Sequence, residues 1–98
     1  MSASESPSYT VRLRNRRVRR ELDALREPDH RRVLAAMRGL AIQPRPVGCE
    51  KLYDDVHRIR VSDRRIIYLV DDENRRVDVG GIRRRSEGTY KGIDDLFR

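Results

Sequence analysis

The sequence predicts an α+β fold in which an antiparallel sheet carries a helical hairpin on one face. Apolar residues recur with helical spacing in the first half of the chain and alternate with polar residues, as in strands, in the second half. The expected element order is β-α-α-β-β-β. Ninety-eight residues suffice for one small domain. We expect residues 1–8 to form a disordered tail and residues 9–98 the single domain.

A first strand and a first helix are predicted near the N-terminus. Residues 9–13 alternate as in a strand. From Asn15 onward the period changes, and Val18, Leu22 and Leu25 fall on one face of a helix. The arginines at positions 16, 17, 19 and 20 lie largely on its other faces.

The second helix has the clearest pattern in the chain. Pro28 suits the first helical position, and Pro44 cannot continue the helix. One apolar stripe runs along it and comprises Val33, Leu34, Met37, Leu40 and Ala41. The tight break between the two helices predicts an antiparallel helical hairpin.

Three strands are expected in the second half, at residues 57–61, 65–71 and 76–82. Short turns between them favour consecutive antiparallel hairpins. Residues 44–55 are predicted to form a loop that could include a short extended piece at 50–53, and residues 93–97 could form a short C-terminal helix.

Charge and composition narrow the possible functions. The net charge is +7 and the pI is near 10.5, and Lys51 and Lys91 are the only lysines. Arginine suits bidentate phosphate contacts, although an arginine-rich genome would produce the same bias. The charge alone favours nucleic acid, an anionic protein and a membrane surface about equally.

Metal, disulfide and membrane functions are not supported by the sequence. Cys49 is the only cysteine, and His30 and His57 are too far apart to suggest a zinc site. No apolar run approaches the ~18 residues of a membrane span, and the N-terminus lacks an apolar signal core. We therefore expect a cytoplasmic protein that has no cofactor and does not bind membranes.

Arginines alternate with apolar residues on the first of the three later strands. Ile59 and Val61 would face the core, so Arg58 and Arg60 would share the opposite face. Fixed guanidinium groups on such a face could hold phosphates. An ordinary solvated face is the alternative. His57 shares the parity of Ile59 and is expected to point toward the core.

The order and spacing of four motifs resemble the RelE/ParE toxin superfamily of bacterial toxin–antitoxin systems, and the RelE branch more than the ParE branch. The motifs are Pro46-x-Gly48-x-x-Lys51-Leu52, Arg58-Ile59-Arg60-Val61, Arg65-Ile66-Ile67-Tyr68, and Ile82-Arg83-Arg84-Arg85 leading to Tyr90. The resemblance extends from Tyr9 to Tyr90. The sequence departs from the family pattern at His57, Ser62 and Arg64, where the family often has an aromatic residue, a glycine and an aromatic residue.

The resemblance implies a metal-independent endoribonuclease that cleaves mRNA in the ribosomal A site by attack of the 2′-hydroxyl. The implied catalytic residues are Arg58, Arg60, Arg65, Arg83 and Tyr90. Contacts to RNA or the ribosome are expected from Arg16, Arg17, Arg19, Arg20, Lys51, Arg84 and Arg85. The expected partners are a cognate antitoxin, the ribosome and mRNA. The toxin alone would be a monomer and its antitoxin complex a higher oligomer.

Arginine supplies only part of this chemistry. It can align the attack and offset charge on the phosphoryl oxygens, but a guanidinium with a pKa above about 12 is a poor proton donor. Tyr90 would either handle the proton or stack on a base. Glu87 reads as an ion-pair partner of nearby arginines rather than as a general base. Two other functions stay open: a ParE-like gyrase inhibitor without enzymatic activity, and an inactive basic interaction module.

The position of Arg83 requires an irregular strand. Arg83 shares the parity of Val77 and Val79, so a regular strand would turn it toward the helices. Gly80-Gly81 lies between, and paired glycines in a strand commonly mark a bulge that shifts the side-chain phase by one residue. We therefore predict an irregularity there that brings Arg83 to the face of Arg58, Arg60 and Arg65.

Overall fold

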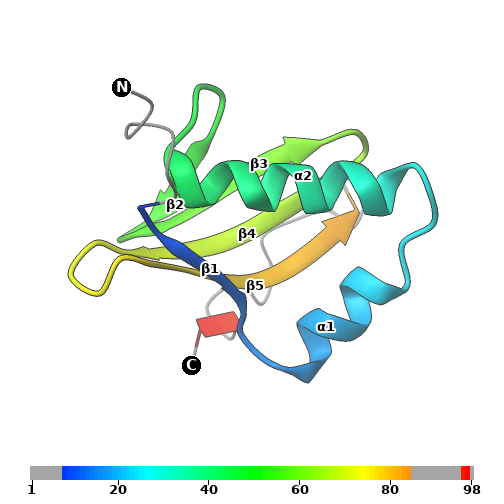
Figure 1. Cartoon of the computed structure of the whole chain (residues 1–98), viewed down its shortest axis with the longest axis horizontal. Coiled ribbons are helices and arrows are strands. Elements are labelled where there is room, and N and C mark those ends of the chain that lie inside the picture. Colours follow the sequence, from blue (N-terminus) through cyan, green and yellow to red (C-terminus); the bar gives the residue numbers. More distant parts are fainter. Residues whose placement is uncertain (1–7, 85–95, 98) are drawn as a thin grey trace.

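Five strands form one mixed sheet in the order β1-β5-β4-β3-β2 (Figure 1). The computed structural model describes residues 8–84, 96 and 97. The strands are β1 (Thr10–Leu13), β2 (Glu50–Tyr53), β3 (Val56–Val61), β4 (Arg64–Asp71) and β5 (Arg76–Arg84), and the helices are α1 (Arg16–Asp23) and α2 (Asp29–Ile42). The predicted α+β class is confirmed. Of the predicted tail at residues 1–8, residues 1–7 lie outside the described residues, and the Ser8 N–H donates to the Ala41 carbonyl at 3.0 Å.

One detail of the predicted sheet was wrong. β1 pairs with β5 in parallel, so the sheet is mixed rather than antiparallel. Residues 50–53, where a short extended piece was predicted, form the four-residue strand β2, which pairs with β3. Alternation shows which face of a strand is buried but not its partner or direction, so the sequence pattern alone could not settle how β1 and β2 pair.

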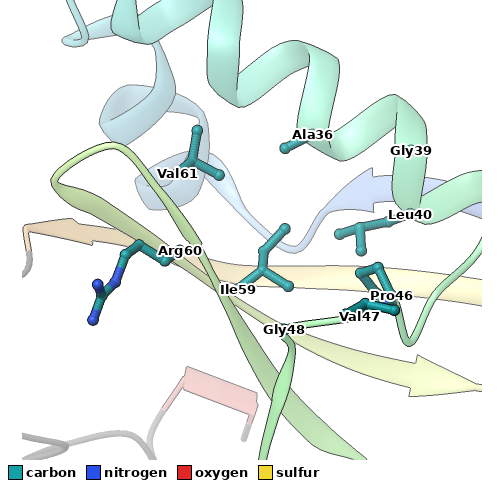
Figure 2. Close-up of a pocket in the computed structure, with 9 residues that line it drawn as sticks. All are labelled: Ala36, Gly39, Leu40, Pro46, Val47, Gly48, Ile59, Arg60 and Val61. Carbon is teal, nitrogen blue, oxygen red and sulfur yellow. The ribbon is translucent and has the colours of Figure 1, made fainter.

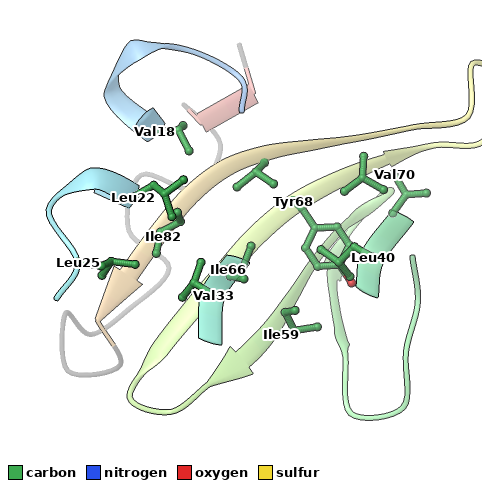
Figure 3. Packing of buried hydrophobic residues seen from close by; sticks show 12 residues of the cluster. Val18, Leu22, Leu25, Val33, Leu40, Ile59, Ile66, Tyr68, Val70 and Ile82 are labelled. Atoms are coloured by element: carbon green, nitrogen blue, oxygen red, sulfur yellow. The ribbon is translucent and has the colours of Figure 1, made fainter. Parts of the chain in front are cut away.

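Both helices pack on the same face of the sheet. Asn15 caps α1 by accepting a hydrogen bond from the Val18 backbone N–H at 3.1 Å, and α2 ends at Ile42, before Pro44. The apolar residues of both helices join those of the sheet in one core (Figure 3). The core comprises Val18, Leu22, Leu25, Val33, Leu40, Ile59, Ile66, Tyr68, Val70, Val77, Val79 and Ile82. Each helix packs mainly against strands rather than against the other helix.

A smaller apolar cluster covers part of the opposite face, which we call the open face. Val56 and Ile67 pack there with Leu96, and Phe97 lies beside them. A Cβ atom on Gly80 would lie only 2.5 Å from the Phe97 ring, so the ring sits directly on the glycine backbone. Of the predicted C-terminal helix at 93–97, residues 93–95 lie outside the described part of the chain.

The predicted irregularity in β5 is confirmed. Ile67 pairs with Gly81 and Tyr68 with Val79, so Gly80 is an extra residue in β5 and forms a bulge. Val79 and Ile82 therefore both reach the helix-covered core, and Arg83 turns to the open face. Among the described residues, no helix is long and apolar enough to cross a membrane.

Candidate active site

Three arginines form a row across the open face of the sheet. Arg60 on β3 pairs with Arg65 on β4, which in turn pairs with Arg83 on β5. Figure 2 shows Arg60 directed away from α2, whereas Ile59 and Val61 point toward it. Neighbouring strands lie about 4.8 Å apart, and like charges directly opposite each other destabilise a sheet. A bound anion would offset the repulsion between these neighbouring guanidinium groups.

A polar hollow of about 280 Å³ lies at one end of the arginine row. Its lining comprises Gly48, Glu50, Arg58, Arg60 and Arg65. Arg58 donates from Nε to Glu50 Oε1 at 2.8 Å, and its Nη2 also binds that oxygen. This ion pair joins β2 to β3 and fixes Arg58 at the wall of the hollow. Three of the predicted catalytic arginines thus converge on one space.

Carboxylates are unevenly distributed over the open face. The buried Asp78 binds Arg12 of β1 and Arg14 just after it: its Oδ2 accepts from Arg14 Nη1 at 2.5 Å, and its Oδ1 lies 3.6 Å from Arg12 Nε. Arg60, by contrast, is exposed and has no carboxylate within ion-pair distance among residues 8–84, 96 and 97. Within the described part of the chain, Arg60 is thus the hollow arginine without an ion pair, whereas Arg58 is paired with Glu50.

Arg83 belongs to the arginine row but does not line the hollow. Its side chain runs back over Gly81, where an added Cβ would lie 3.4 Å from Arg83 Nε. The same Nε lies 3.6 Å from Oε2 of Glu21 on α1. Sequence reasoning missed both Glu21 and Glu50. The spacing of Arg17 and Glu21 indicates a helical ion pair, but nothing in it points to β5.

The other predicted site residues are not gathered with the arginine row. Lys51 pairs with His57 and Arg84 with Arg64, so both lie on the helix-side face of the sheet. Tyr90, Glu87 and Arg85 lie outside the described residues. Within the described part of the chain, no group of three or more histidine, cysteine, aspartate or glutamate side chains could hold a metal ion.

The arginines of α1 divide into two kinds. Arg16 and Arg20 are exposed, and Arg19 is exposed with its Nε 3.4 Å from Asp23. Arg17 instead donates to Glu21 Oε2 at 3.0 Å and to the Gly80 carbonyl at 2.9 Å. Three of these residues could contact a polyanion, while Arg17 holds the helix to the sheet.

A second hollow, of about 440 Å³ and mainly apolar, lies on the helix side between α2, residues 46–48 and β3 (Figure 2). Leu40, Pro46 and Ile59 line it, and Val47 at its rim is fully exposed. An apolar side chain of a binding partner would fit such a surface.

His57 is part of the core, as its parity predicted. It is 4% exposed and stacks on Tyr68 with 5.7 Å between ring centroids. Burial lowers the pKa of His57, and the nearby Arg45 lowers it further. Tyr68 donates to the Pro44 carbonyl at 2.8 Å, and burial raises its pKa. Neither group is placed to transfer protons at the arginine row.

Replacing His57 with phenylalanine should make the free energy of unfolding less dependent on pH. The pKa of His57 is lower in the folded protein than its value of about 6.5 in the unfolded chain. Its favourable contribution is therefore complete above pH 6.5 and declines as the pH falls below that value, by at most about 1.4 kcal/mol per pH unit. Denaturant titrations at pH 7.5 and 5.5 measure this, and His30 is present in both proteins. If the free energy of unfolding fell by the same amount between pH 7.5 and 5.5 in the wild-type protein and in His57→Phe, the prediction would be contradicted.

No family model matches the sequence, and no curated protein matches it. Several solved structures are similar to this chain. The RelE–RelB complex of Pyrococcus horikoshii contains a chain with 23% identity and a TM-score of 0.71, over 83% of this chain and 99% of that one. A mutated Escherichia coli toxin RelE in the free state has 16% identity and a TM-score of 0.74, over 92% and 95%. A RelBE toxin–antitoxin complex of Mycobacterium tuberculosis has 28% identity and a TM-score of 0.57, over 82% and 100%.

This chain has the RelE fold. The agreement spans nearly the full length of each solved chain, so it includes the sheet that carries the arginine row. The expectation of a RelE-like fold from the four short motifs is thereby confirmed.

Proposed function

We propose that this chain is the toxin of a bacterial type II toxin–antitoxin system and a metal-independent endoribonuclease that cleaves mRNA in the ribosomal A site. The observation that carries the proposal is the row Arg60–Arg65–Arg83, with Arg58 beside it, on the open face of a RelE fold. Like charges on adjacent strands repel one another, and a phosphodiester bound among them would reduce that repulsion.

The geometry suits phosphoryl transfer within RNA. In this proposal Arg58, Arg60 and Arg65 hold the scissile phosphate in the polar hollow and orient it for attack by the adjacent 2′-hydroxyl. The guanidinium groups offset the negative charge that grows on the phosphoryl oxygens as the new P–O bond forms and the bond to the 5′-oxygen breaks. The proton of the 2′-hydroxyl must leave and one must reach the 5′-oxygen. Tyr90 remains our candidate for this transfer.

An acidic antitoxin is the proposed protein partner. The similar structures from P. horikoshii and M. tuberculosis are toxin–antitoxin complexes, and another structure holds E. coli RelE with a peptide of the antitoxin RelB. The charge of +7 and the exposed Arg60 favour an acidic segment that becomes ordered on binding. The apolar hollow next to α2 offers a place for its hydrophobic side chains. In the cytoplasm such a complex would keep the toxin inactive.

Primer extension on mRNA after brief induction of the toxin tests the proposal. We expect codon-phased cuts whose downstream fragments carry a 5′-hydroxyl, because attack by the 2′-hydroxyl leaves the phosphate on the upstream fragment. The control is a variant with both Arg60 and Arg65 replaced by alanine. DNA damage signalling without RNA cuts would instead identify a gyrase inhibitor. Cuts that leave 5′-phosphates would rule out the 2′-hydroxyl mechanism.

A further inference from the structure

Helix α1 contacts β5 at the point where β1 no longer covers it. β1 ends at Leu13, opposite Val79, so within residues 8–84, 96 and 97 no strand pairs with that edge of β5 from Gly80 onward. Two side chains one helical turn apart contact the backbone there. Arg17 donates to the Gly80 carbonyl at 2.9 Å, and Glu21 accepts from the Ile82 N–H at 2.9 Å. We call this pair the α1 clamp.

The α1 clamp holds the bulge that sets the direction of Arg83. Gly80 is the extra residue of β5, and Ile82 is the first residue beyond the bulge to face the core. Because Arg17 and Glu21 bind on either side of Gly81, they fix the backbone immediately before Arg83. The two side chains also bind each other, with Arg17 Nη1 at 3.0 Å from Glu21 Oε2.

Glu21 also reaches the Arg83 side chain itself. One carboxylate oxygen, Oε1, binds the Ile82 N–H, while the other, Oε2, faces Arg83 Nε at 3.6 Å. This Nε is buried and has no hydrogen-bond partner among the described residues, so Glu21 acts on it through charge, while the side chain as a whole remains 37% exposed. The other guanidinium nitrogens of Arg83 make no hydrogen bond to the described residues. Glu21 thus occupies the inner edge of the guanidinium and leaves its outer edge for a ligand.

We infer that Glu21 is a positioning residue for the reaction, and that it acts by holding the Arg83 guanidinium in place at the end of the arginine row, beside the hollow proposed to bind the substrate phosphate. The inference rests on the proposed function. A flexible arginine would have to be ordered on binding, at an entropic cost, and Arg65 on the neighbouring strand would repel it. The Glu21 carboxylate orders Arg83 and offsets its repulsion from Arg65 before the substrate binds. Arg83 is then already in place when negative charge grows on the phosphate, so its interaction favours the transition state.

Glu21→Gln separates this role from simple capping of the sheet edge. Glutamine can still accept the Ile82 N–H through Oε1, but its NH₂ group replaces the oxygen that faces Arg17 and Arg83. Donors would then oppose donors, and Arg83 would lose its anchor. Asp23→Asn is the matched control, because Asp23 forms the same kind of helical ion pair with Arg19 on α1 but is exposed and makes no hydrogen bond or ion pair with the described residues of β5.

The first measurement is independent of catalysis. ¹⁵N relaxation reports the order of the Arg83 Nε–H group, whose signal is identified by its absence from Arg83→Ala. We expect a high order parameter S² for this group in the wild-type protein and in Asp23→Asn. In Glu21→Gln, S² should decline toward the flexible range, below about 0.6. Unchanged order in Glu21→Gln would overturn the inference, whether or not the protein cleaves RNA.

The second measurement is single-turnover cleavage of ribosome-bound mRNA at saturating ribosome concentration. Glu21→Gln should lower the rate constant about tenfold with little change in ribosome affinity, and should have no further effect when Arg83 is already alanine. A tenfold loss that persists in the Arg83→Ala background would assign Glu21 a general structural role and overturn the inference. A wild-type rate in Glu21→Gln would also overturn the inference.

If the wild-type protein makes no cut at all, the proposed function fails. A loss of Arg83 order in Glu21→Gln would then show that the contact exists without a role in cleavage.

Discussion

Arg65→Ala should lower the single-turnover rate of mRNA cleavage by about 100-fold or more, which is the range found when one preorganised donor to a developing oxyanion is removed. Arg65 is the central member of the arginine row, paired with Arg60 on one side and Arg83 on the other, and it lines the polar hollow. Its loss would therefore separate the remaining cations and open the centre of the proposed phosphate site.

The expected loss is in the rate rather than in ribosome affinity, because the offset charge grows mainly in the transition state. Arg65→Lys should fall between Arg65→Ala and the wild-type protein, since lysine keeps the charge but cannot bind phosphate with two parallel donors. Arg38→Ala is the matched control: Arg38 is an exposed arginine of α2, on the helix-covered side of the sheet. Equal rates for Arg65→Ala and Arg38→Ala would remove Arg65 from the active site.

The faces of the strands were predictable because alternation depends only on neighbouring residues. Ile59 and Val61 had to be buried together, which placed Arg58 and Arg60 on the other face. The same reasoning placed His57 in the core, where it stacks on Tyr68. The bulge was predictable for a related reason, because Gly80-Gly81 supplied the only signal needed to reverse the parity of Arg83. The face of each side chain and the position of the bulge therefore depend on neighbouring residues in the sequence, which is why the sequence predicts them.

Pairing between distant segments was not predictable in the same way. The parallel contact of β1 with β5 joins residues more than sixty positions apart, and no local pattern specifies its direction. The carboxylates that bind the site arginines were missed for the same reason. Glu50 faces Arg58 only because β2 forms next to β3, and Glu21 meets Arg83 only because β1 ends before the bulge.

One departure from the family pattern has a structural explanation. Ser62 stands where the RelE/ParE pattern often has glycine, and its φ of 56° lies in the left-handed region. Glycine adopts that conformation without steric cost. Ser62 adopts it here, and the turn between β3 and β4 places Arg60 opposite Arg65.

Replacing Arg16, Arg19 and Arg20 together with glutamine should weaken ribosome binding strongly while leaving the chemical step intact. These are the exposed arginines of α1, and none of them contacts the arginine row among the described residues. Phosphate binding by each arginine releases counterions, so the slope of log affinity against log salt should become shallower by about 0.7 to 0.9 for every arginine that binds a phosphate in the wild-type protein. At low salt the affinity should fall by roughly 10- to 100-fold.

Arg17 is not one of the exposed arginines of α1, so an Arg17 variant can be compared with the triple variant. Although its place in the sequence suggests an RNA contact like its neighbours, it binds Glu21 and the Gly80 carbonyl. Arg17→Gln should therefore slow cleavage through the bulge and Arg83, with little change in the salt dependence of ribosome binding. The two variants are compared by ribosome co-sedimentation across a salt series and by single-turnover cleavage at saturating ribosome concentration. If the triple variant bound ribosomes normally but cleaved slowly, the exposed arginines of α1 would belong to the catalytic machinery, and the division between a binding helix and a catalytic sheet face would be wrong.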